Sequence, residues 1–100
     1  MQKEIKTFED GVAEISKEMD AVLVKKHHDY GCKNILNTPM GAEIGILIRL
    51  HDKLSRLANL LKEGKEPNNE SIDDTWLDIR NYGQIGMLVR RKLFELPLKK

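Results

Sequence analysis

Apolar residues recur at intervals of three and four along three separate segments of this 100-residue chain, and no other feature constrains the fold as much. Such spacing places apolar side chains on one face of an α-helix, because a helical turn holds about 3.6 residues. An amphipathic helix of this kind buries its apolar face against other helices. The first segment shows the pattern most clearly, at Phe8, Val12, Ile15, Met19, Val22 and Leu23.

Local signals for helix ends divide the chain into three predicted helices, at about residues 7–28, 39–63 and 70–94. Thr7 is a capping residue, and Thr38 stands before a proline that can occupy the first turn of a helix. Gly64 and Pro67 mark a loop, and Pro97 ends the ordered structure. We therefore expect a single all-α domain over residues 1–100, a small bundle of three main helices.

Charge and cysteine content exclude several classes of protein. Seventeen Lys and Arg residues against sixteen Asp and Glu residues leave a net charge of +1, so we expect no direct binding of nucleic acid. The single cysteine, Cys32, cannot form an internal disulfide and fits a reducing compartment. The most apolar window, residues 44–50, is far shorter than the ~20 residues that span a bilayer. These features predict a cytoplasmic protein that does not cross a membrane.

The third predicted helix carries apolar side chains on two sides. Its core-facing stripe is formed by Ile72, Trp76, Ile79, Gly83, Gly86 and Met87. On the opposite side, an acidic stripe continues into Ile85 and Leu88. A bundle of three helices would leave that aliphatic end in water. We therefore expect a homo-oligomer, at least a dimer, in which a partner chain covers this side.

Three carboxylates of the third predicted helix form the first candidate site. Glu70, Asp74 and Asp78 are spaced four residues apart, which places them on one helix face. A divalent cation would relieve their repulsion, and Mg²⁺ favours carboxylate, water and phosphate oxygens. In the alternative, Ser71 and the nearby acids only cap the first turn, which leaves Asp78 unexplained. The spacing leaves both interpretations open, and the metal-binding one predicts Mg²⁺ here, with Mn²⁺ as a second candidate ion.

The second candidate site is a polar stripe on the second predicted helix, formed by Arg49, Asp52, Lys53 and Arg56. In one interpretation these residues make surface salt bridges at spacings of three and four, which contribute little stability. In the other, the arginines and the lysine bind phosphate oxygens, and Asp52 orients them. The spacing is compatible with both.

The third candidate site is the segment 25–34, where the first predicted helix gives way to a loop. Binding residues commonly lie at such junctions. Tyr30 can stack on a base or ribose, or it can pack with its hydroxyl in water. The segment lacks CxxC and HExxH patterns, so we expect no zinc site. The candidates for contact with a base or sugar are His27, Tyr30, Lys33 and Asn34.

Three motifs follow one another in the order Lys26-His-His-Asp-Tyr-Gly31, Ile48-Arg-Leu-His-Asp-Lys-Leu-Ser-Arg-Leu57 and Glu70-Ser-Ile-Asp-Asp-Thr-Trp-Leu-Asp-Ile-Arg-Asn-Tyr82. This order resembles the phage and prophage family called nucleotide modification associated domain 1. The likeness covers about residues 20–85 and implies a role in phage nucleotide metabolism. More distantly, the layout is similar to the MazG-like all-α nucleoside triphosphate pyrophosphatases, whose acidic residues bind Mg²⁺.

The resemblance implies a Mg²⁺-dependent pyrophosphohydrolase in which Asp74 and Asp78 are catalytic and Asn81 belongs to the substrate-binding set. One departure from that pattern is clear, because the paired-glutamate motif of the preceding helix is absent. A second hypothesis is therefore a protein that binds a nucleotide or cyclic nucleotide and sequesters it without cleavage. A third is a structural bundle that binds partners through its helices.

Overall fold

The computed structural model describes residues 4–100, so the first three residues of the predicted domain lie outside the described residues. These described residues form four helices, α1 (Phe8–Tyr30), α2 (Lys33–Leu36), α3 (Ala42–Glu63) and α4 (Ile72–Arg90). Residues 4–100 contain no strand, which confirms the all-α class. None of the described helices is both long enough and apolar enough to cross a membrane.

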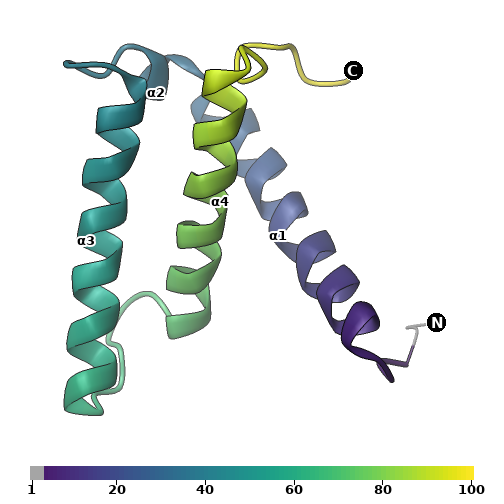
Figure 1. Cartoon of the computed structure of the whole chain (residues 1–100), viewed down its shortest axis with the longest axis vertical. Helices are drawn as coiled ribbons and strands as arrows, with labels where there is room; N and C mark the ends of the chain where they lie inside the picture. Colours follow the sequence, from purple (N-terminus) through teal and green to yellow (C-terminus); the bar gives the residue numbers. More distant parts are fainter. Residues whose placement is uncertain (1–3) are drawn as a thin grey trace.

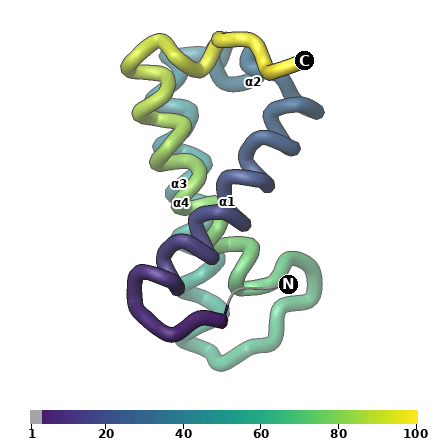
Figure 2. Tube along the Cα trace, turned by 90° about the vertical axis from the view of Figure 1, so that its right-hand side faces the viewer, coloured from purple at the N-terminus to yellow at the C-terminus, as the bar shows by residue number. Residues whose placement is uncertain are grey.

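Helices α3 and α4 lie side by side and run in opposite directions, and α1 passes behind α4 at an angle (Figure 1). The turned view shows α1 crossing the α3–α4 pair (Figure 2). α1 approaches α4 near its middle, where the Met19 carbonyl accepts a hydrogen bond from Asn81. Its N-terminal end diverges from the pair in Figure 1 and its C-terminal end does so in Figure 2, and α1 has no buried residue. The short α2 joins α1 to α3 at the end of the molecule where the C-terminal segment also lies.

Two predicted helix ends are confirmed. The Thr7 hydroxyl accepts a hydrogen bond from the Asp10 N–H at 3.0 Å, and the Asp10 carboxylate accepts one from the Thr7 N–H at 3.3 Å. This reciprocal capping box fixes the start of α1. Gly64 ends α3 with φ at 63°, a left-handed conformation that glycine adopts without strain.

The predicted start of the second helix at residue 39 is wrong. Met40 and Gly41 have φ values of 72° and 102°, which are incompatible with a right-handed helix, so α3 begins at Ala42. Thr38 does not cap α3, because its hydroxyl donates a hydrogen bond back to the Ile35 carbonyl at 2.8 Å. Pattern reasoning also missed α2, whose four residues are too few to show a period.

The third predicted helix is shorter than expected. α4 begins after Ser71, whose hydroxyl accepts a hydrogen bond from the Asp74 N–H at 3.0 Å. It ends at Arg90 because the backbone turns at Lys92, where φ is 57°. Glu70 therefore precedes the helix, and the expected helical face of three carboxylates does not form.

The apolar core is small and lies where α2, α3 and the C-terminal segment meet. Ile35, Ile46 and Phe94 are buried there, and Ile85 and Leu88 pack against them. The premise that the chain leaves Ile85 and Leu88 in water is therefore wrong, whereas the predicted partner chain stays a prediction. A second set of buried side chains lies elsewhere in the fold, formed by Leu57, Leu60 and Leu77.

The opposite stripe of α4, which was expected to face the core, is covered only in part, because Ile72, Ile79 and Gly86 are partly buried and its other members are exposed. Trp76 and Met87 on that stripe are about half exposed, at 49% and 52%. Both sides of α4 carry apolar residues and both are partly covered, so the spacing alone did not identify the side that packs against the core cluster.

The close approach of α3 to Thr38 gives a test of this packing. A β-carbon at Gly45 would lie 2.5 Å from the Thr38 Cγ2, and the Thr38 hydroxyl is held by the carbonyls of Asn34 and Ile35. We expect Gly45→Ala to lower the free energy of unfolding in urea by about 1–3 kcal/mol, although Ala favours helix. At Gly11 nothing lies within 4 Å, so Gly11→Ala should raise that free energy by up to about 1 kcal/mol. A Gly45→Ala protein as stable as the wild type would contradict this packing.

Candidate functional site

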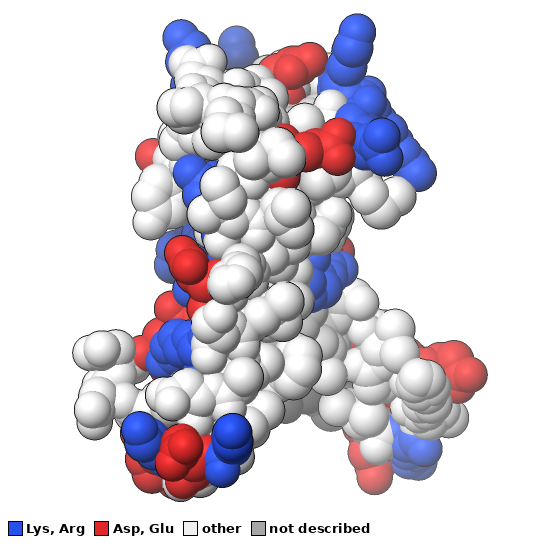
Figure 3. Space-filling model, turned by 60° about the vertical axis from the view of Figure 1, so that its left-hand side comes forward, with Lys and Arg blue, Asp and Glu red and all other residues white. Residues whose placement is uncertain are grey.

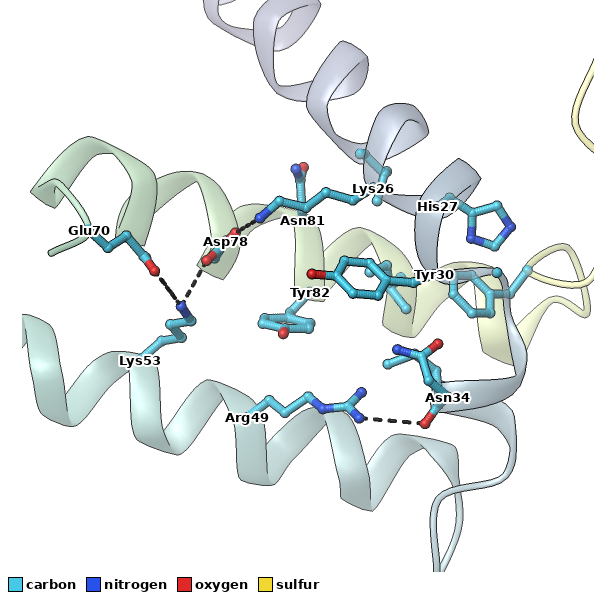
Figure 4. Close-up of a pocket in the computed structure, with 15 residues that line it drawn as sticks. Lys26, His27, Tyr30, Asn34, Arg49, Lys53, Glu70, Asp78, Asn81 and Tyr82 are labelled. Atoms are coloured by element: carbon cyan, nitrogen blue, oxygen red, sulfur yellow. Dashed lines mark hydrogen bonds and ion pairs between the residues drawn. The ribbon is translucent and has the colours of Figure 1, made fainter.

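A pocket of about 430 Å³ lies between the C-terminal half of α1, the first half of α3 and the middle of α4 (Figure 4). This volume is typical of sites for small molecules. Charged, aromatic and aliphatic side chains are mixed in its lining, which consists of Leu23, Lys26, His27, Tyr30, Gly31, Asn34, Ile35, Arg49, Lys53, Glu70, Asp78, Asn81, Tyr82, Ile85 and Phe94.

One end of the pocket is formed by two lysines and two carboxylates. The Lys53 ammonium lies 2.9 Å from the Asp78 Oδ2 and 3.1 Å from the Glu70 Oε2. The Lys26 ammonium donates a hydrogen bond to the other Asp78 oxygen at 3.0 Å. This lysine–carboxylate network joins α1, α3, α4 and the residue before the cap of α4. Asp78 and Lys53 are its most buried members, with side chains 13% and 24% exposed.

The network shifts two pKa values in opposite directions. Burial raises the pKa of Asp78, but hydrogen bonds from Lys53 and Lys26 outweigh burial and hold this pKa below 3.8. Burial lowers the pKa of Lys53, but the hydrogen bonds to Asp78 and Glu70 outweigh it and hold this pKa above 10.5. Asp78 and Lys53 are both charged at neutral pH, and each stabilises the charge of the other.

Arg49 forms the opposite end of the pocket, and its positive charge is not balanced by a neighbouring carboxylate. Its Nη2 donates a long hydrogen bond of 3.5 Å to the Asn34 carbonyl. Its Nη1 is buried and has no hydrogen-bond partner among the described residues. No carboxylate of residues 4–100 forms an ion pair with it. Arg49 therefore presents an unpaired, partly desolvated positive charge to the pocket.

Aromatic rings occupy the middle of the pocket. Tyr82 from α4 lies between Arg49 and the lysine–carboxylate network, and the ring of Tyr30 from α1 lies beside Tyr82 (Figure 4). Tyr30 is largely exposed, whereas Tyr82 is partly buried. His27 and Phe94 pack with their ring centroids 4.8 Å apart. The pocket thus offers ring faces in its middle and charged groups at both ends.

The pocket brings together eight of the twelve residues singled out in the sequence: His27, Tyr30, Asn34, Arg49, Lys53, Glu70, Asp78 and Asn81. Among them, Asn81 also holds two helices together. Its side-chain amide donates a hydrogen bond to the Met19 carbonyl of α1 at 3.2 Å. Its Oδ1 accepts one from Arg80 at 2.9 Å. Asn81 is 5% exposed, so it mainly positions α1 against α4.

The other four residues, Lys33, Asp52, Arg56 and Asp74, do not line the pocket. Arg56 instead fastens the start of α4 to α3, because its guanidinium donates to the Thr75 hydroxyl and to the Glu70 carbonyl. Lys33, Asp52 and Asp74 are exposed. Asp74 lies in the first turn of α4, where a carboxylate favours the positive end of the helix dipole.

Sequence reasoning missed Lys26 and Tyr82 as site residues. Lys26 is 52 residues from its partner Asp78, and such a contact between helices leaves no periodic signal. Both missed residues nevertheless lie within the motifs quoted above, so membership of a motif could have indicated them as site residues.

The carboxylates that could bind a metal are Glu70 and Asp78, since they converge on one point. The Lys53 ammonium occupies that point. Among the described residues, no third His, Cys, Asp or Glu side chain joins them to form a metal-binding group. A divalent ion would have to displace Lys53, so the donor set as arranged fits an ammonium and not a resident Mg²⁺.

The lysine–carboxylate network can be tested through its pH dependence. Because the folded-state pKa of Asp78 lies below 3.8, its contribution is present above that pH and is lost as the pH falls through the folded value. We expect Asp78→Asn to lower the free energy of unfolding by about 1–3 kcal/mol at neutral pH. The difference from wild type should shrink in acid, as denaturation curves from about pH 2 to pH 8 would show.

The matched control is Asp52→Asn, which removes an exposed carboxylate of α3. Its effect should stay within about 0.5 kcal/mol at every pH. A gap between wild type and Asp78→Asn that does not change with pH would contradict the role assigned to this carboxylate.

Comparison with known proteins identifies the family. The family model described as nucleotide modification associated domain 1 matches residues 26–89. Of the residues that line the pocket, Leu23 and Phe94 alone lie outside this match. Among curated proteins and among solved structures, no match to the chain is found. Since the matched segment covers well over half of the chain, the protein belongs to the nucleotide modification associated domain 1 family.

Proposed function

We propose that this protein binds a nucleotide in the pocket between α1, α3 and α4. The observation that carries the proposal is the guanidinium of Arg49, whose buried Nη1 lacks a partner among residues 4–100. An unsatisfied buried donor costs free energy, more so when it is charged. A bound anion would remove that cost, and the planar guanidinium matches the oxygens of a phosphate group.

The charge distribution in the pocket favours an anion at the Arg49 end. Lys26 and Lys53 are neutralised by Asp78 and Glu70. The lining residues carry three positive and two negative charges, and the unbalanced one is that of Arg49. A phosphate group at Arg49 would balance it without disturbing the lysine–carboxylate network.

The rings of Tyr30 and Tyr82 suit the base of a nucleotide whose phosphate lies at Arg49. Bases stack on aromatic side chains whatever their sequence, because each base has a π-face. The network beyond the rings offers hydrogen-bond donors and acceptors to a base edge or sugar hydroxyl. The family description, which names nucleotide modification, supports a nucleotide over other anions.

Substitution of Arg49 tests the proposal. A hydrogen bond to a charged group is worth about 1.5–3 kcal/mol, so Arg49→Ala should weaken nucleotide binding roughly 10- to 150-fold. Folding stability should change little, because the substitution also removes an unsatisfied donor. Isothermal titration calorimetry with nucleoside triphosphates, deoxynucleoside triphosphates and cyclic dinucleotides measures the affinity, and thermal melts measure stability.

The matched control is Lys33→Ala, which removes an exposed cation that does not line the pocket. Its affinity should equal that of the wild type. Equal affinities for wild type and Arg49→Ala, or no binding anywhere in the panel, would refute the proposed function.

Mg²⁺-dependent hydrolysis by Asp74 and Asp78, with Glu70 as a further metal ligand, stays a prediction, and sequestration without cleavage is its alternative. The two are separated by incubating the protein with each nucleotide and Mg²⁺ or Mn²⁺, followed by chromatography. Hydrolysis between the α and β phosphates releases a nucleoside monophosphate and pyrophosphate, and Asp78→Asn should abolish it. Quantitative recovery of the intact nucleotide after denaturation of the protein would contradict hydrolysis and leave binding as the function. Because Lys53 occupies the point between the carboxylates, we favour binding without cleavage.

A further inference from the structure

We propose that the outer face of the α3–α4 pair binds the same face of a second copy of this chain, which gives a two-fold symmetric dimer. The outer face is the side turned away from the pocket, and its members are Leu47, Leu54 and Leu61 of α3 with Trp76 and Met87 of α4. Each of these five side chains is between 49% and 60% exposed. The proposal is independent of what the pocket binds.

Helix geometry places the outer face opposite the pocket. Trp76 and the pocket-lining Asp78 are two residues apart, which turns their side chains about 200° from each other around α4. At one end of the pair, the Arg90 Nε lies 3.2 Å from the Glu43 Oε1. These two ionic residues lie about one helical turn beyond the outer face on their respective helices. The apolar stripes of α3 and α4 therefore belong to one continuous surface.

The leucines of α3 follow the spacing by which helices pair. Leu47, Leu50, Leu54, Leu57 and Leu61 are separated by three, four, three and four residues, the heptad pattern of a helix seam. Leu57 is buried and Leu50 is partly buried, whereas the other three are more than half exposed. The chain itself covers one flank of the seam, and the other flank is left for a helix of another chain.

The outer face carries few charges between its ends, which suits contact with its own copy. Arg80 follows Trp76 by one helical turn on α4, but its Nη1 lies 2.8 Å from the Asp20 Oδ1 of α1, so its charge is paired. Figure 3 turns the α3 side of the molecule forward and shows uncharged atoms from one end to the other, with Lys, Arg, Asp and Glu at the margins and ends. Across a two-fold axis a residue near the axis meets the same residue of the partner. A charged face would repel itself there, but an uncharged apolar face would not.

The exposed area of the chain is also what a dimer requires. Its accessible surface is 8133 Å², whereas a compact monomer of 11.5 kDa exposes roughly 5,800 Å². The excess of roughly 2,300 Å² is of the size that one chain buries in an obligate homodimer, roughly 1,000–2,500 Å². The radius of gyration, 15.5 Å, likewise exceeds the ~13 Å expected for a compact chain of this length.

Trp76 is the single tryptophan of the chain, so the unmodified protein reports on its own outer face. Light scattering should give a mass of twice 11.5 kDa at micromolar concentration. Acrylamide should quench Trp76 fluorescence weakly in the dimer, and more strongly as dilution lowers the mass. Leu54→Glu, which carries a charge into the interface twice per dimer, should raise the dissociation constant roughly thirtyfold or more.

The matched control is Ile15→Glu on α1, because Ile15 is 53% exposed and Leu54 is 52% exposed. We expect Ile15→Glu to keep the dimer mass. A monomeric parent, or a Leu54→Glu protein that keeps the dimer mass, would overturn the proposal. If Leu54→Glu fails to fold, as circular dichroism would show, the parent protein alone decides. Strong quenching of Trp76 in a parent dimer would overturn the proposed face, and protection of Trp76 would support it.

Discussion

The ammonium of Lys53, shared between the carboxylates of Glu70 and Asp78, is the interaction on which the rest of the structure depends. It joins α3 to Glu70, which precedes the cap of α4, and to Asp78, which lies in the middle of α4. Asp78 extends the same network to α1 through Lys26. The apolar core is small, and α1 has no buried residue, so polar contacts carry much of the positioning of α1. The pocket exists because these contacts hold α1 at an angle to the α3–α4 pair.

The two ends of the pocket differ in whether their charged groups already have partners within the protein. At one end every charge has a partner, which stabilises the fold and leaves little free energy for a ligand to gain. At the other end, the buried Nη1 of Arg49 has no hydrogen-bond partner among residues 4–100. A ligand gains most where the protein has left a group unsatisfied. Arg56 stabilises the fold and is not available to a ligand, because its guanidinium is already bound to Thr75 and to the Glu70 carbonyl.

Helix class and most of the helix positions were predictable, because spacing and capping are local properties of a sequence. The start of α1 at Thr7 followed from its cap, whereas the start of α3 was displaced by the positive φ values of Met40 and Gly41. The core side of α4 was not predictable, since apolar residues lie on both of its sides. The pocket was predictable in part, through residues clustered in motifs, but the pairing of Lys26 with Asp78 depends on how helices cross. Spacing along one helix contains no information about that crossing.

We propose that a nucleotide phosphate binds at Arg49 between α1, α3 and α4. The most direct test is a nuclear magnetic resonance titration of the isotopically labelled protein with a nucleoside triphosphate, following the Nε–H signal of Arg49. We expect a saturable shift of this signal and of the backbone signals of Tyr30 and Tyr82, while the indole signal of Trp76 on the opposite face stays in place. Shifts that leave Arg49 unchanged, or that cluster around Trp76, would contradict it.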